Sequence, residues 1–143
     1  MEKLISLHKH WLNADAIKHV VKTKIGGNSG LPKELQEFAE IHSAFARISV
    51  FYGLIYVVIE GYLELNLSNE NVDSLLAKDE FVNALRLFRN ATFHYQKQAT
   101  PEKALKFLEL KESEHWIREL HLAFKLYFEE TLPIKEWYDK LDV

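Results

Sequence analysis

An apolar stripe that runs from Pro32 to about Leu65 limits what this chain can fold into. Its members recur every three or four residues, a spacing that puts them on one face of an α-helix. Proline is favoured in a first helical turn, and no other proline follows within the stripe. The sequence therefore predicts one uninterrupted helix over residues 32–65, about 50 Å long. The stripe comprises Leu35, Phe38, Ile41, Phe45, Ile48, Phe51, Tyr52, Ile55, Val58, Ile59 and Tyr62.

The second half of this segment is apolar on nearly all sides, which is typical of the central helix of a bundle. Gly53 and Gly61 within it allow a close helix contact or a bend. Helical spacing and capping residues predict further helices over residues 2–23, 71–77, 80–98, 101–110 and 113–130, and a short one after Pro133. The glycine-rich residues 26–30 predict a connector, since no Lys-Ser or Lys-Thr step follows them as in a phosphate-binding loop. We expect an all-α antiparallel bundle of four to five main helices, with residues 1–143 in a single domain.

Charge and cysteine content exclude several classes of function. The 18 basic and 21 acidic residues give a net charge of −3, which disfavours a broad cationic surface for duplex DNA. The chain has no cysteine, so it has no disulfide, no thiolate nucleophile and no cysteine-ligated metal site. We expect a cytoplasmic protein with no membrane partner, because the N-terminus lacks a signal-peptide pattern and the apolar run 48–59 is too short to cross a bilayer.

The residues most suggestive of chemistry lie in the segment 88–95. On a helical wheel, Asn90 and His94 share one polar face, whereas Tyr95 lies on the apolar arc and Arg89 falls at its edge. An arginine there needs a carboxylate, a phosphate or water, since its charge cannot be lost. We expect its partner to be Glu60, a lone carboxylate within the apolar stretch of the neighbouring helix. The pair is either a structural ion pair that fixes helix register or a carboxylate that orients the arginine.

The pattern Arg89-Asn90-x-x-x-His94 resembles the signature of the HEPN superfamily, small all-helical domains of RNases, toxins and phage-defence systems. The surrounding residues 87–96 and the segment Val58-Ile59-Glu60-Gly61 are similar to prokaryotic members. The resemblance implies a HEPN-like fold over essentially the whole chain. It also implies an endoribonuclease that needs no metal or other cofactor, leaves a 2′,3′-cyclic phosphate, and joins two such motifs across a homodimer.

The chemistry of these side chains suits such a reaction. Imidazole exchanges protons near neutral pH, so His94 is the expected acid or base. The Arg89 guanidinium can stabilise a phosphate, and Asn90 can hold a phosphate oxygen or the histidine ring. Arg89 and His94 are five positions apart, about 140° on an ideal helix, which favours a composite site across a dimer. Supporting roles are expected for Glu60, Arg86 and Tyr95.

Two other functions fit the same residues. In a non-catalytic module, Arg89 and His94 would hold a nucleotide or phosphate without cleaving it, and the chain would pair with a nucleotidyltransferase-like protein. An antitoxin is the expected partner if the chain is a toxin. In a dimeric scaffold, the motif would be vestigial. A metal site at His8 and His10 is disfavoured, because two positions on a helix point roughly 200° apart.

Overall fold

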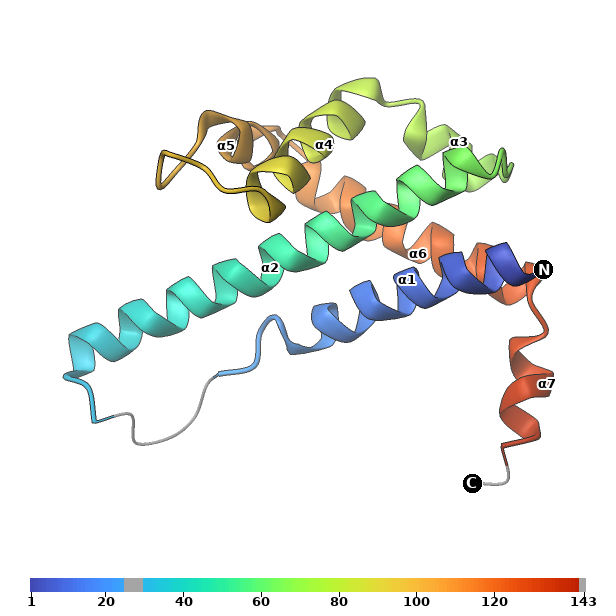
Figure 1. Cartoon of the computed structure of the whole chain (residues 1–143), viewed down its shortest axis with the longest axis horizontal. Helices are drawn as coiled ribbons and strands as arrows, with labels where there is room; N and C mark the ends of the chain where they lie inside the picture. Colours follow the sequence, from blue (N-terminus) through green and yellow to red (C-terminus); the bar gives the residue numbers. More distant parts are fainter. Residues whose placement is uncertain (25–29, 142–143) are drawn as a thin grey trace.

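The computed structural model describes residues 1–24 and 30–141, and these form seven α-helices with no β-strand (Figure 1). The all-α prediction is thereby confirmed. The helices are α1 (Glu2–Val20), α2 (Lys33–Glu64), α3 (Glu70–Leu76), α4 (Asp79–Phe93), α5 (Glu102–Glu109), α6 (Ser113–Thr131) and α7 (Ile134–Asp139). Four to five main helices were expected; of the seven found, α3, α5 and α7 have eight residues or fewer. Residues 26–29 of the predicted connector lie outside the described residues.

The central helix is α2, as its all-round apolar second half predicts. Figure 1 shows α1 along one side of α2 and α4 along the other, with α6 crossing behind them. Tyr62 of α2 lies edge-on to Phe124 of α6, with ring centroids 5.5 Å apart, and Tyr52 meets Phe88 of α4 at 5.6 Å. Burial of large rings such as these is a major contribution to the stability of the core.

The end of α1 is fixed by Arg47 of α2. Its guanidinium donates hydrogen bonds to the carbonyl oxygens of Val20 and, at 2.7 Å, Thr23. Because the last carbonyls of a helix have no partner within it, this arginine satisfies groups that would otherwise need water. The helix ends at Val20, three residues before the predicted end.

The end of α4 differs more from its predicted position than the end of α1 does. Residues 80–98 were expected to be helical, but α4 stops at Phe93 and His94 is extended, with φ −114° and ψ 143°. Phe88 is the last fully buried residue of the helix, while Tyr95, expected on the apolar arc, is 91 % exposed. Most helix stability in a protein comes from packing, so a segment that meets no neighbour gains little from continuing as helix.

Two glycines of α2 allow close approach of side chains from other helices. A β-carbon on Gly53 would lie 2.4 Å from a ring atom of Phe93, and one on Gly61 would lie 2.5 Å from Leu7. The last residue of α4 is therefore seated directly against the middle of α2. This contact determines where the segment that begins with His94 leaves the bundle.

The side chain of His121 in α6 is buried against the rings of Trp11 and Phe51. Burial and the nearby Lys18 lower its pKa from the ordinary 6.5 to about 4, against the opposing effect of Asp15. The ring is therefore neutral at pH 7. Its Nε2 lies 3.0 Å from Oδ1 of Asp15 but is not aligned for a hydrogen bond.

This histidine makes the stability of the fold depend on pH. The folded pKa lies below the unfolded one, so the unfolded state binds a proton first as the pH falls from 6.5 toward 4. We expect the free energy of unfolding to drop by about 2 kcal/mol between pH 7 and pH 5 from this group. Urea unfolding at the two pH values measures it. His121→Leu should remove that part of the pH dependence; an unchanged dependence in the variant would contradict the assignment.

By length and composition alone, α2 is the one helix of the described residues that is long and apolar enough to cross a membrane. Its residues Phe51, Ile55, Val58, Ile59 and Tyr62 are buried within the bundle. A core position thus accounts for the apolar character of its second half.

Candidate functional site

The predicted pairing of Arg89 with Glu60 is present. Nη2 of Arg89 on α4 donates to Oε1 of Glu60 on α2 at 2.5 Å. The guanidinium carbon also lies 5.0 Å from the centroid of the Tyr56 ring, a cation–π arrangement. Tyr56 and Glu60 are four residues apart, so one face of α2 presents both to the arginine. Two separate contacts from one helix hold this guanidinium against α2.

Arg89 retains donors that no described protein group uses. A guanidinium has five N–H donors in a planar fork, of which the bond to Glu60 takes one. Its side chain is 22 % exposed, and its Nε is buried without a hydrogen-bond partner among the described residues, so Nε is closed to a ligand from the surface. An oxyanion that approaches from the surface can bind only the remaining Nη donors.

Arg86 belongs to the same cluster. Burial and the Glu60 carboxylate raise the pKa of Tyr56, while the charges of Arg86 and Arg89 oppose the rise. Both guanidinium groups are therefore within electrostatic reach of one phenol. Arg86 lies on the solvent side of α4, one turn before Arg89. With Glu60 neutralising one of them, the two arginines leave one net positive charge at this surface.

His94 lies outside the helix that carries Arg89 and Asn90. Its backbone N–H donates to the Asn90 carbonyl at 3.0 Å, and Gln96 donates to the His94 carbonyl at 3.1 Å. Its ring is exposed and makes no hydrogen bond, ion pair or ring contact with another described residue. Because α4 ends before it, Asn90 and His94 do not share a helical face, which corrects that prediction. The 140° separation from Arg89 does not apply for the same reason.

The end of α4 determines where the polar side chains of this segment lie. His94 immediately follows the last helical residue, Phe93, and Arg89 lies five positions earlier within the helix. Asn90 is half-buried and its side chain makes no hydrogen bond to a described residue, so its amide is free for a ligand. Tyr95 is directed to solvent and contacts neither group.

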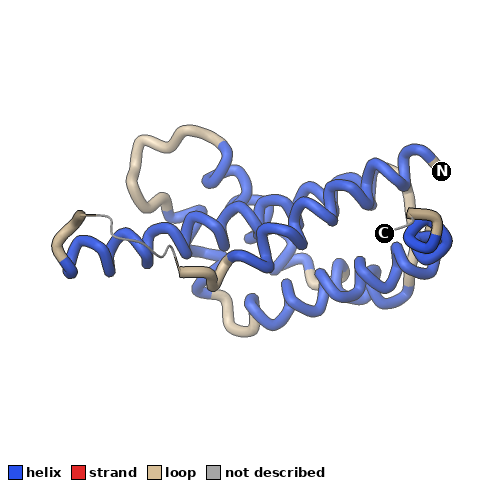
Figure 2. Tube along the Cα trace, turned by 90° about the horizontal axis from the view of Figure 1, so that it is seen from below, coloured by secondary structure: helices blue, strands red, loops and turns tan. Residues whose placement is uncertain are grey.

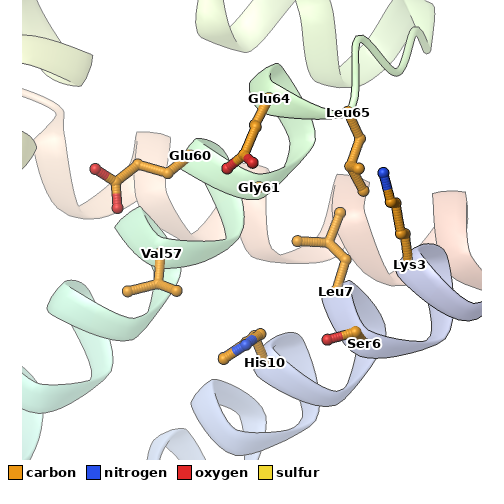
Figure 3. A pocket seen from close by; sticks show the side chains of 9 residues that line it. All are labelled: Lys3, Ser6, Leu7, His10, Val57, Glu60, Gly61, Glu64 and Leu65. Carbon is orange, nitrogen blue, oxygen red and sulfur yellow. The ribbon is translucent and has the colours of Figure 1, made fainter.

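A pocket of about 400 Å³ adjoins this cluster between α1 and α2 (Figure 3). Sequence reasoning did not find it, because it arises from two helices whose relative placement no motif reveals. Figure 3 shows the Glu60 carboxylate turned away from the α1 side chains of the pocket. Glu60 thus separates the pocket from Arg89. The pocket is lined by Lys3, Ser6, Leu7, His10, Val57, Glu60, Gly61, Glu64 and Leu65.

Tyr56 is the contributor to the site that the sequence did not reveal. It looked like one of several core aromatics, and its spacing of four residues before Glu60 was the available signal. Of the histidines of α1, His10 lines the pocket beside Glu60. His8 stacks on Trp11 and lies against Phe128. Within residues 1–24 and 30–141, no three His, Asp or Glu side chains gather as a metal ion would require.

Comparison with protein-family models, curated proteins and solved structures finds no significant match.

Proposed function

We propose that this chain is a metal-independent endoribonuclease of the HEPN type. The observation that carries the proposal is the state of Arg89. It is held against α2 by Glu60 and Tyr56, has unused donors, and lies five residues before an exposed imidazole. A positioned cation and a free proton carrier are the two groups that phosphodiester cleavage without a metal requires.

The reaction is an internal transesterification of the RNA backbone. A neutral His94 takes the proton of the ribose 2′-hydroxyl as the 2′-oxygen bonds to phosphorus. The bond from phosphorus to the 5′-oxygen breaks, and the leaving oxygen takes a proton from an imidazolium. Arg89 donates to the phosphate oxygens, whose charge rises in the transition state. Asn90 holds a phosphate oxygen or the ring of His94.

The two proton transfers require two imidazoles in opposite protonation states. One chain brings one histidine to this surface, so we propose that a second copy supplies the other across a two-fold axis. The pairing also gives the phosphate a second arginine, which offsets the neutralising effect of Glu60 on the first. The supporting roles of Arg86 and Tyr95 are then contacts to RNA outside the scissile bond. We place this activity in the cytoplasm, in a toxin or phage-defence system.

The nature of the product tests the proposal. The purified chain, incubated with a mixture of single-stranded RNAs in excess EDTA, should yield fragments with 2′,3′-cyclic phosphate and 5′-hydroxyl ends. EDTA should not slow the reaction, because Arg89 and His94 supply the charge and proton transfer. Phosphatase and ligase treatment followed by mass spectrometry identifies the ends. Fragments with 3′-hydroxyl and 5′-phosphate ends, or loss of cleavage in EDTA, would contradict the mechanism.

The second candidate is a non-catalytic module that binds a nucleotide or phosphate and pairs with a nucleotidyltransferase-like protein. It is favoured by the His94 ring, which no other described side chain orients. The net charge of −3 also suits a small ligand better than unaided binding of long RNA. Calorimetric titration with nucleotides that shows binding, together with intact RNA, would favour this function over the nuclease.

A further inference from the structure

The apolar stripe of α2 is continuous along the helix, but only its second half is covered. Tyr52, Ile55, Ile59 and Tyr62 are buried in the core. At the same alternating spacing of three and four, the first half presents Phe38, Ile41 and Phe45, of which Phe38 is 69 % and Ile41 70 % exposed. Leu35, also exposed, extends the same surface. A stripe of this kind is a helix-packing surface that lacks its partner helix.

This exposed half projects from the bundle as an arm, residues 33–46. Figures 1 and 2 show the N-terminal part of α2 extending past the ends of α1 and α6. Arg47, which binds the carbonyls of Val20 and Thr23, marks where α1 ends beside α2. The fourteen residues of the arm extend roughly 21 Å, at about 1.5 Å per residue.

A groove of about 410 Å³ lies at the base of the arm, between α1, α2 and the start of α6. Its floor is apolar and includes Ile48 and Tyr52, the next members of the same stripe, together with Phe51 and Ile117. Its rim carries the basic side chains of Lys18, Lys22 and Arg118, with Glu114 as the one acidic member. Arg118 and Glu114 are ion-paired at 3.3 Å, so the two lysines set the charge of the rim.

The tip of the arm is complementary to this groove in shape and charge. Leu35 and Phe38 project from the tip, and the exposed carboxylates of Glu34 and Glu37 flank them. The tip therefore offers apolar side chains edged with negative charge, whereas the groove offers an apolar floor edged with positive charge. The tip and the groove of one chain lie at different positions along the same helix, α2. The tip can therefore enter only the groove of another copy of the chain.

We propose that two copies of this chain pack their arms antiparallel about a two-fold axis near Ile41. In this register, Phe38 of each copy lies at the level of Phe45 of the other. Leu35 lies at the level of Ile48, over the floor of the opposite groove. Glu34 and Glu37 then lie beside the lysines of that rim. The two contacts are identical, as a two-fold axis requires, and they bury the stripe along its whole exposed length.

The charge of the arm favours a second copy over a lipid surface. Carboxylates flank the apolar stripe at Glu34 and Glu37, and anionic headgroups repel them. Lys18 and Lys22 lie at the base of the arm, and the one lysine at its tip, Lys33, is outnumbered by these two carboxylates. A second copy brings an acidic tip to each basic groove and leaves neither charge unmatched.

The arm contact is separate from the contact proposed for RNA cleavage. Tyr56, which Arg89 contacts, is fifteen positions from Ile41 along α2. The two copies of Arg89 would therefore be about 45 Å apart along the helix axis. The arms leave both clusters free, so the two contacts can form independently of each other.

Substitutions on the arm test the contact, because its loss lowers the molecular mass of the assembly in solution. Phe38→Glu with Ile41→Glu should weaken the self-association constant at least about a hundredfold, since it places four carboxylates at the centre of the contact. Light scattering after size exclusion should show half the wild-type mass. The matched control is Leu122→Glu with Leu126→Glu, two exposed leucines on α6, which should leave the mass unchanged. A monomeric wild-type chain at 100 µM, or equal masses for wild type and arm variant, would overturn the proposal.

Charge exchange tests whether tip and groove meet across copies. One chain carries Glu34→Lys with Glu37→Lys, and another carries Lys18→Glu with Lys22→Glu. At low salt each alone should associate at least about tenfold more weakly than wild type, because like charges face each other. An equimolar mixture should recover wild-type mass, since each basic tip then meets an acidic groove.

Circular dichroism establishes that each of these variants is folded, and all the substituted side chains are exposed. Failure of the mixture to recover, or binding of the wild-type arm to phosphatidylcholine–phosphatidylserine vesicles in place of self-association, would overturn the proposal. RNA cleavage is measured on the same samples. A chain that loses mass and still cleaves separates this interface from the proposed nuclease.

Discussion

His94→Ala should reduce RNA cleavage at least about a thousandfold, because it removes both the group that takes the 2′-hydroxyl proton and the group that protonates the leaving oxygen. The fold should be unaffected. The ring of His94 is exposed and makes no hydrogen bond, ion pair or ring contact with another described residue, so the free energy of unfolding should stay within about 0.5 kcal/mol of wild type. Initial cleavage rates of a fluorogenic RNA and urea unfolding measure the two quantities.

The control for this variant is His115→Ala. His115 is also exposed, and on α6 it lies 3.2 Å from Glu119, remote in sequence from the motif. Its loss should leave cleavage unchanged. Equal rates for wild type and His94→Ala would show that His94 transfers no proton, and the phosphate-binding module would then be the function to pursue.

The same variant distinguishes a site made by two chains from a site made by one. If each site needs His94 from both copies, a mixed dimer with one wild-type chain is inactive. Adding excess His94→Ala chain should therefore lower the activity per wild-type chain by at least about fivefold, as subunits exchange at random. If the activity per wild-type chain stays unchanged when the variant is added, one chain is sufficient to form the site.

Sequence reasoning succeeded where one residue or segment must satisfy a local physical requirement. Pro32 and the uninterrupted stripe defined α2 within a residue at each end. The pairing of Arg89 with Glu60 followed from the cost of leaving a charge without a partner on an apolar face. Both inferences need no knowledge of where other helices lie.

It failed where the outcome depends on whether a neighbour is present. Tyr95 has the spacing of an apolar arc, and Phe38 and Ile41 have the spacing of a core stripe, yet all three are exposed. Periodicity shows which residues share a face and not what covers that face. The early end of α4, which moved His94 off the face of Asn90, has the same cause. The segment after Phe93 packs against no neighbouring helix, so it gains little by continuing as helix.

Arg89→Ala should lower kcat at least about a hundredfold, since it removes the cation that stabilises the phosphate in the transition state. Arg89→Lys should recover only part of the loss, because an ammonium lacks the planar fork that can reach two phosphate oxygens and Glu60 together. Neither should destabilise the fold by more than about 1 kcal/mol, the range for an ion pair whose carboxylate is largely exposed. Steady-state kinetics and urea unfolding of both variants measure these effects.

The role of Glu60 decides between the two interpretations of the pair. If Glu60 positions Arg89, then kcat should fall further the more completely a substitution of Glu60 removes its hydrogen bond to Arg89. Glu60→Ala should then lower kcat about tenfold, and Glu60→Gln, which keeps an oxygen acceptor, should lower it less, while both unfold at nearly the wild-type urea concentration. A purely structural pair predicts the reverse: both variants lose stability and keep kcat. The exposure of Glu60, 45 %, favours the first result, because a pair so open to water contributes little to stability and can still hold a guanidinium in one orientation.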